Sequence, residues 1–146
     1  MASGRNEVDY TDIGFNAQTY KIDGVTIVYD RTKPNGISIA AGAGLGVMLS
    51  ADDTVALTND GAAVEGKLIK VESDNFATVQ IEGFSTLPKG DSGTNSVTRG
   101  RRIVGATRGG VRGFVRDVDT AVAAELGKMG GKVINVADAD NVVVKL

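Results

Sequence analysis

The chain has 146 residues, a formal net charge of −2 at pH 7, 42% hydrophobic residues and only 5% aromatic residues. That length favours one domain, which can bury a core without a disulfide or a metal. Cys, His and Trp are all absent from the sequence. Without Cys there is no disulfide or thiol nucleophile, and without His the commonest general base and transition-metal ligand are missing. We therefore expect a protein that is not an enzyme and that holds no cofactor or metal.

The N-terminal segment, residues 1–18, is polar and has no periodic pattern. It lacks the apolar stretch of a signal peptide, and no run in the chain approaches the roughly 18 apolar residues that span a bilayer. We therefore expect synthesis in a cytosol-like compartment and no membrane partner. We interpret residues 1–18 as an extended arm that contacts another subunit through Tyr10, Ile13 and Phe15, with a frayed terminus as the alternative. Residues 19–146 then form a single β-rich domain.

From residue 19 the pattern is one of short strands separated by turn residues. Asp23-Gly24, between residues 20–22 and 25–29, is typical of a hairpin, because Asp-Gly adopts the positive φ angles of a two-residue turn. Residues 77–82 alternate apolar and polar side chains, as a strand with one buried face does. Turns are expected at residues 34–36 and 87–90, and further strands at residues 37–39, 47–49, 54–58, 64–72, 102–106 and 111–116.

One amphipathic helix is expected near the C-terminus. It begins at Asp117 or Asp119, ends at Gly130-Gly131, and buries a face that consists of Val118, Ala121, Val122, Leu126 and Met129. Residues 132–136 and 142–146 then form a hairpin, whose last strand is apolar enough to be buried in the fold or in a subunit interface. The elements together predict a mainly β protein: a small β-barrel or β-sandwich of short strands, with one short α-helix near the C-terminus and an extended N-terminal arm.

Three short motifs suggest ligand sites but fail in their context. Residues 61–67 fit the first seven positions of a P-loop, but Leu68 replaces the hydroxyl that binds magnesium, and a strand follows instead of a helix. Residues 42–46 have G-x-G-x-G spacing, which is not the dinucleotide-binding fingerprint. Residues 138–141 resemble the start of a calcium loop, but too few residues follow to complete it. We interpret all three as turns.

The segment of residues 92–116 is the most informative one for function. It holds six of the eight arginines and no acidic residue: Arg99, Arg101, Arg102, Arg108, Arg112 and Arg116. Arginine favours bidentate recognition of carboxylates or phosphates. The segment has one aromatic residue, Phe114, whereas a protein that binds single-stranded nucleic acid usually offers a stacking platform. Docking on an acidic protein surface is therefore the first interpretation, a solvated face the second, and nucleic-acid binding the third.

Two regions together resemble the capsid cement, or head decoration, proteins of tailed bacteriophages. The first runs from residues 46–50 through 52–57 into 78–88, and the second from residues 113–116 through 120–125 to 142–146. The resemblance implies a non-enzymatic β-rich protein that binds the outer surface of an icosahedral head and stabilises capsomer junctions. It also implies the major capsid protein as partner, location in the virion after synthesis in the host cytoplasm, and assembly as a homotrimer.

Two other functions stay open at this point. A small β-barrel that binds nucleic acid through residues 99–116 is the main alternative, and the Arg-rich segment is its support. A module of the virion that binds a glycan or a host receptor is the second alternative. The sequence neither supports nor excludes it.

Overall fold

The computed structural model describes residues 14–37, 44–136 and 139–146. The protein is mainly β with one short α-helix near the C-terminus, as the sequence predicts. The elements in chain order are β1 (Asn16–Ile22), the 3₁₀-helix η2 (Pro34–Gly36), β2 (Gly46–Ala51), β3 (Thr54–Leu57), β4 (Gly66–Val71), β5 (Phe76–Glu82), β6 (Phe84–Pro88), β7 (Ile103–Arg108), β8 (Val111–Asp117), α1 (Ala123–Leu126), β9 (Lys132–Asn135) and β10 (Asn141–Lys145).

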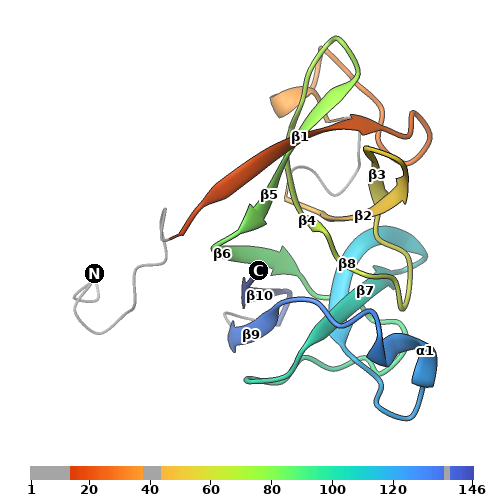
Figure 1. Ribbon diagram of the computed structural model, residues 1–146, viewed down its shortest axis with the longest axis vertical. Helices are drawn as coiled ribbons and strands as arrows, with labels where there is room; N and C mark the ends of the chain where they lie inside the picture. Colours follow the sequence, from red (N-terminus) through yellow and green to blue (C-terminus); the bar gives the residue numbers. More distant parts are fainter. Residues whose placement is uncertain (1–13, 38–43, 137–138) are drawn as a thin grey trace.

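The first five strands form a closed barrel in the order β1-β3-β2-β4-β5, with β1 and β5 paired to complete it. Neighbouring strands are antiparallel except β1 and β3, which run parallel over a short stretch where Lys21 pairs with Thr54. Figure 1 shows this barrel in the upper half of the molecule. Closure removes most of the open strand edges that a small sheet would otherwise expose.

The remaining strands form a second layer below the barrel (Figure 1). Strands β6, β10 and β9 make a three-stranded sheet with β10 in the centre, and β7 and β8 form a hairpin. Val142 and Val144 of β10 are fully buried. The apolar C-terminal strand is therefore buried within its own subunit, which removes the need for a subunit interface to cover it.

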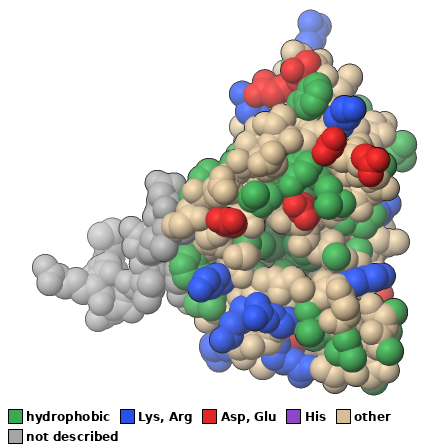
Figure 2. Space-filling view, viewed as in Figure 1, with side chains coloured by type: hydrophobic (Ala, Val, Ile, Leu, Met, Phe, Trp, Pro, Cys, Tyr) green, Lys and Arg blue, Asp and Glu red, His purple; other side chains and the backbone are tan. Residues whose placement is uncertain are grey.

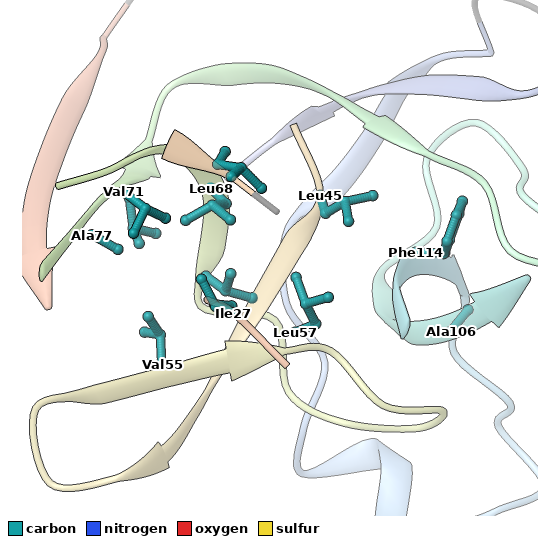
Figure 3. Close-up of a cluster of buried hydrophobic side chains, with 12 residues drawn as sticks. Ile27, Leu45, Val55, Leu57, Leu68, Val71, Ala77, Ala106 and Phe114 are labelled. Carbon is teal, nitrogen blue, oxygen red and sulfur yellow. The ribbon is translucent and has the colours of Figure 1, made fainter. Parts of the chain in front are cut away.

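Two apolar clusters hold these layers together. The first fills the barrel, where Ile27, Leu57 and Leu68 point toward one another, and extends to Phe114 and Ala106 of the β7–β8 hairpin (Figure 3). The second lies between the hairpin and the three-stranded sheet and consists of Leu87, Ile103, Val115, Val133, Val142 and Val144. The hairpin contributes to both clusters, so it joins the barrel to the second layer.

The prediction of a hairpin at residues 20–29 is wrong. Residues 25–29 do not pair with β1, which lies between β5 and β3. The Asp23 carboxylate instead accepts hydrogen bonds from the backbone N–H groups of Val25, Thr26 and Ile27. An Asp side chain that satisfies the following N–H groups competes with ladder formation. The segment is therefore a loop, which places Ile27 in the barrel core.

The C-terminal helix is much shorter than the apolar pattern predicts. It spans only Ala123–Leu126, and Val122, Leu126 and Met129 of the expected buried face are exposed, whereas Val118 is buried. The buried residue of the helix is Glu125. Gly127 weakens the last turn, and Asp119 accepts a hydrogen bond from the N–H of Ala121 in a separate turn before the helix. An ionic contact, described below, replaces the expected apolar packing.

Two further boundaries differ from the sequence-based prediction. Residues 16–18, which were assigned to the arm, belong to β1 and pair with β5. Residues 84–88, of which the last two were expected to form a turn, make the strand β6. Residues 38 and 39 of the expected strand 37–39 and the start of the 138–141 turn lie outside the described residues.

Candidate functional site

Arg116, a candidate docking residue, is buried inside the protein with 2% of its surface exposed. Its Nε donates to Asp60 Oδ1 at 2.9 Å, and its Nη1 and Nη2 donate to the Glu125 carboxylate at 3.1 and 2.5 Å. Its Nη1 also donates to the carbonyl of Asp117. The hydrogen bonds from Arg116 hold the pKa values of Glu125 and Asp60 below their ordinary range. Arg116 is therefore a structural residue that does not reach the surface.

Arg108 and Arg112 are also engaged within the fold. The Arg108 guanidinium donates to the backbone carbonyls of Lys89 and Asp140 and lies 4.7 Å from the centre of the Phe114 ring. It therefore ties the β7–β8 hairpin to the ends of β6 and β10. Arg112 is half-buried, and its Nη2 lies 3.9 Å from the sulfur of Met48. The six arginines thus do not form a single surface patch.

The other three arginines, Arg99, Arg101 and Arg102, are exposed. Arg101 makes a long ion pair of 3.9 Å with the buried Asp117, and about half of its side chain stays exposed. This segment runs antiparallel to β9: the N–H of Gly100 donates to Val133, and the N–H of Val133 donates to Arg101. Residues 100–102 therefore lie along the free edge of β9 and add one short segment to the sheet β6-β10-β9.

Three cations meet across this extended sheet. Lys132 of β9 pairs directly with Lys145 of β10 on one side, and with Arg102 in an isolated antiparallel bridge on the other. Side chains directly opposite each other in antiparallel strands share one face, with their Cβ atoms about 4.5–5.5 Å apart. Arg102, Lys132 and Lys145 therefore form a row that runs from β10 across β9 to the segment beside it. We call it the cationic row.

The cationic row lines a groove of about 580 Å³ together with Val64, Glu65, Ile81, Met129, Gly130, Gly131 and Leu146. Among the residues that the structure describes, no ion pair within 4.0 Å involves the row. Figure 2 shows Lys and Arg side chains gathered in the lower part of this face, over β9, whereas most Asp and Glu side chains in view lie over the barrel. The groove therefore offers concentrated positive charge beside apolar side chains.

Glu65 is the acidic residue in the lining of the groove, and it already has a partner. The hydroxyl of Tyr20 donates to Glu65 Oε1 at 2.6 Å. Burial of the Tyr20 hydroxyl, together with this hydrogen bond, raises the pKa of Tyr20 to about 12. Tyr20 therefore stays protonated and holds the Glu65 carboxylate, which makes no ion pair with the row among the described residues.

The residue types that line the groove suit the binding of an anionic group. Arg and Lys bind carboxylates and phosphates, and the apolar lining can take an apolar side chain. Within residues 14–37, 44–136 and 139–146, no three Asp or Glu side chains come together as metal ligands. Sequence reasoning identified Arg102 but missed Lys132 and Lys145, because only the strand order brings them beside it.

The P-loop-like segment leads into a strand and packs closely against its neighbour in the barrel. The second glycine of the motif, Gly66, lies against β5, and a Cβ atom there would be 2.0 Å from the carbonyl oxygen of Gln80. The strand expected at residues 64–72 is β4, and it begins at Gly66, two residues later than expected. The glycine is therefore required for close strand packing within the barrel.

The arm residues of the candidate site are only partly described. Tyr10 and Ile13 lie outside the described residues, and Phe15, just before β1, is about half exposed. Exposed apolar side chains also occur around α1, where Val122, Leu126 and Met129 lie, and Met129 lines the groove. Met129 is thus the exposed apolar residue near α1 that the groove shares.

The fold and the site together describe a β-barrel protein with a groove that is lined by a cationic row. Searches of protein-family models, curated proteins and solved structures found no match to this chain. In the part of the chain that is described, no helix has the length and hydrophobicity to cross a bilayer.

Proposed function

We propose that the protein is a non-enzymatic structural protein of a virion: a capsid cement protein that binds the outer surface of an icosahedral phage head and stabilises capsomer junctions. The partner is the major capsid protein, and the docking surface is the groove with the cationic row. The resemblance of residues 46–88 and 113–146 to head decoration proteins supports this proposal. The mainly β fold, with a closed barrel, is compatible with it.

The cationic row is the observation that carries the proposal. Like charges directly opposite each other on neighbouring strands destabilise a sheet. Here three such side chains stand in register without an acidic neighbour in an ion pair among the described residues. An acidic surface on a partner would remove this repulsion and gain charge-assisted hydrogen bonds to Arg102. The row therefore fits a surface that works in a complex.

The experiment measures attachment to expanded heads of the encoding phage that lack the protein. The triple variant Arg102→Ala, Lys132→Ala, Lys145→Ala should co-sediment with these heads far less than the wild type does. Desolvated charge contacts cost about 2–5 kcal/mol when one partner is truncated. The matched control removes three exposed cations elsewhere, Lys21→Ala, Arg31→Ala, Lys33→Ala, and should attach normally. Wild-type occupancy by the groove variant would overturn the proposal.

A homotrimer is part of the proposal, because a cement protein at threefold positions would match that symmetry. The C-terminal strand is buried within its own sheet, so the contact between subunits must use another surface. Val122 and Leu126 at α1 are exposed and suit that contact. Light scattering of the isolated protein tests a preformed trimer, and a monomer at tens of micromolar would contradict it.

Nucleic-acid binding is the second candidate, because a row of three cations also fits phosphates. Arg99 and Arg101, in the strand segment beside β9, would extend such a surface. This candidate makes a different prediction for the same triple variant. Gel shifts with DNA or RNA should weaken as salt is added and disappear in the groove variant, whereas a capsid-binding protein gives no shift at physiological salt.

A further inference from the structure

The groove lies next to the point where the N-terminal segment joins the barrel. Gly14 lines a second pocket of about 490 Å³ together with Glu82, Gly83, Phe84, Lys145 and Leu146. Lys145 and Leu146 line the groove as well. The two hollows therefore adjoin at the end of β10, and the chain that precedes Gly14 starts beside one end of the cationic row.

The sequence before Gly14 is complementary to the groove in charge and in apolar content. Residues 7–13 read Glu-Val-Asp-Tyr-Thr-Asp-Ile, with three acids and no base. The row contributes three cations, and the groove around it offers Val64, Ile81 and Met129 to apolar side chains. An extended segment of this composition can place carboxylates on the row while Val8, Tyr10 or Ile13 contacts the apolar lining.

We propose that the groove is the docking site of the chain's own acidic segment, residues 7–13, in the free protein. Seven extended residues reach about 23–25 Å, and three neighbouring strands span only about 10 Å, so the segment is long enough to cross the row. Attachment at Gly14 gives the segment a high effective concentration at its own groove. The contact concerns the isolated protein and stands whether or not the partner is a capsid.

The carboxylates of residues 7–13 would reduce the repulsion among the three cations of the row in the absence of a partner. The contact also sets a threshold for binding, because an acidic partner must displace residues 7–13 to reach Arg102, Lys132 and Lys145. Weak nonspecific anions would be excluded, and the displaced segment would be free to contact a neighbouring subunit. Removal of the acids in the segment should therefore increase the affinity of the groove for other polyanions.

The test uses the full chain with one reporter. Since the protein has no Trp, the substitution Tyr10→Trp introduces a single indole whose exposure to acrylamide can be measured. We expect quenching to be weak at low salt and to rise severalfold in about 1 M NaCl, where the Debye length falls to about 3 Å. Charge reversal in the groove, Lys132→Glu with Lys145→Glu, should give the same rise without added salt. The control Lys21→Glu with Lys33→Glu should leave quenching weak.

A charge swap keeps the test valid even if the groove variant is poorly folded. Positions 9 and 12 lie outside every described strand. The double variant Asp9→Lys, Asp12→Lys should by itself expose the indole. Combining it with the groove reversal should restore the protection. If neither charge reversal, in the groove or in the segment, changed the quenching, the proposal would be overturned. Protection that is lost on dilution would also overturn it, because it would place the segment in the groove of a second copy.

Discussion

The Arg116 guanidinium and the Glu125 carboxylate face each other in the interior, joined by hydrogen bonds of 2.5 and 3.1 Å. Glu125 also accepts the backbone N–H of Asp119 at 2.8 Å. These contacts fasten α1, which is only four residues long, to strand β8. Because the apolar residues on either side of Glu125 are exposed, the ion pair, and no apolar face, holds this part of the chain in place.

Glu125→Gln should destabilise the protein by about 3 kcal/mol or more, because it leaves the buried Arg116 charge without its main partner. Urea denaturation measures the change. The control is Glu72→Gln, which breaks an exposed ion pair with Lys70 and should cost less than about 1 kcal/mol. Equal losses of unfolding free energy in the two variants would show that the buried pair stabilises the protein no more than the exposed pair does.

Stability should fall below about pH 4 through the same network. The pKa values of Glu125 and Asp60 are lowered in the folded state by their hydrogen bonds to Arg116. Their contribution is therefore fully present above the ordinary carboxyl pKa values of about 4 and is lost as the pH falls through the lowered values. Thermal melts between about pH 6 and pH 2 should show this loss, and the slope should be smaller in Glu125→Gln.

Gly93→Ala should be strongly destabilising for a second reason connected with Arg116. Gly93 has a φ of +56°, and a Cβ atom there would lie 2.1 Å from Arg116 Nε. The control is Gly100→Ala, at φ +82° with nothing within 4 Å of the new Cβ. The control measures backbone strain alone, about 1–2 kcal/mol. If the two variants have the same melting temperature, the close approach to Arg116 has no effect on stability.

Arg108→Ala should lower the stability of the protein, whereas Arg102→Ala should leave it nearly unchanged. The Arg108 guanidinium holds two backbone carbonyls and stacks over Phe114, so its removal should cost about 1.5–3 kcal/mol. Arg102 is exposed and makes no ion pair within 4.0 Å in the described structure. In a binding assay the order reverses, and Arg102→Ala should be the more damaging change. Thermal denaturation beside co-sedimentation separates the two roles.

Deletion of residues 2–13 should leave the folded domain nearly as stable as the full chain. The barrel begins at Asn16, which pairs with Glu82, so the deletion removes no described strand. The melting temperature should shift by no more than a few degrees, which for this size corresponds to about 1 kcal/mol. The deletion also uncovers the cationic row, so attachment to phage heads should strengthen, unless the arm itself contacts a neighbouring subunit, in which case attachment should weaken. A large loss of stability would mean that the arm is part of the core.

Alternation and turn residues in the sequence predict much of the fold. Residues 54–58, 77–82, 102–106 and 111–116 are strands, as expected, and Gly109-Gly110 connects β7 to β8. Local chemistry misleads at two places. Asp23-Gly24 was expected to form a two-residue hairpin turn, yet Asp23 satisfies the following N–H groups with its side chain. The apolar spacing around residues 118–129 predicts a longer helix, although much of that spacing faces solvent.

The site could be predicted only in part. The excess of Arg in residues 92–116 points to the correct region, and Arg99, Arg101 and Arg102 are on the surface. Arg116 is in the same run, and nothing in its own neighbourhood distinguishes it from the exposed arginines. Its partners, Asp60 and Glu125, come from separate parts of the chain. Burial of a charge depends on such distant partners, so no local pattern can reveal it.

The sequence by itself determined the class of this protein: a cysteine- and histidine-free β domain whose short strands are set by alternating apolar residues and by glycine and Asx turns. These properties are local, because a strand or a turn depends on residues that are neighbours in the chain. Only the tertiary structure decided which cations are structural and which form the cationic row. Arg102, Lys132 and Lys145 meet because β9 lies between β10 and residues 100–102, and strand order depends on how the whole core packs.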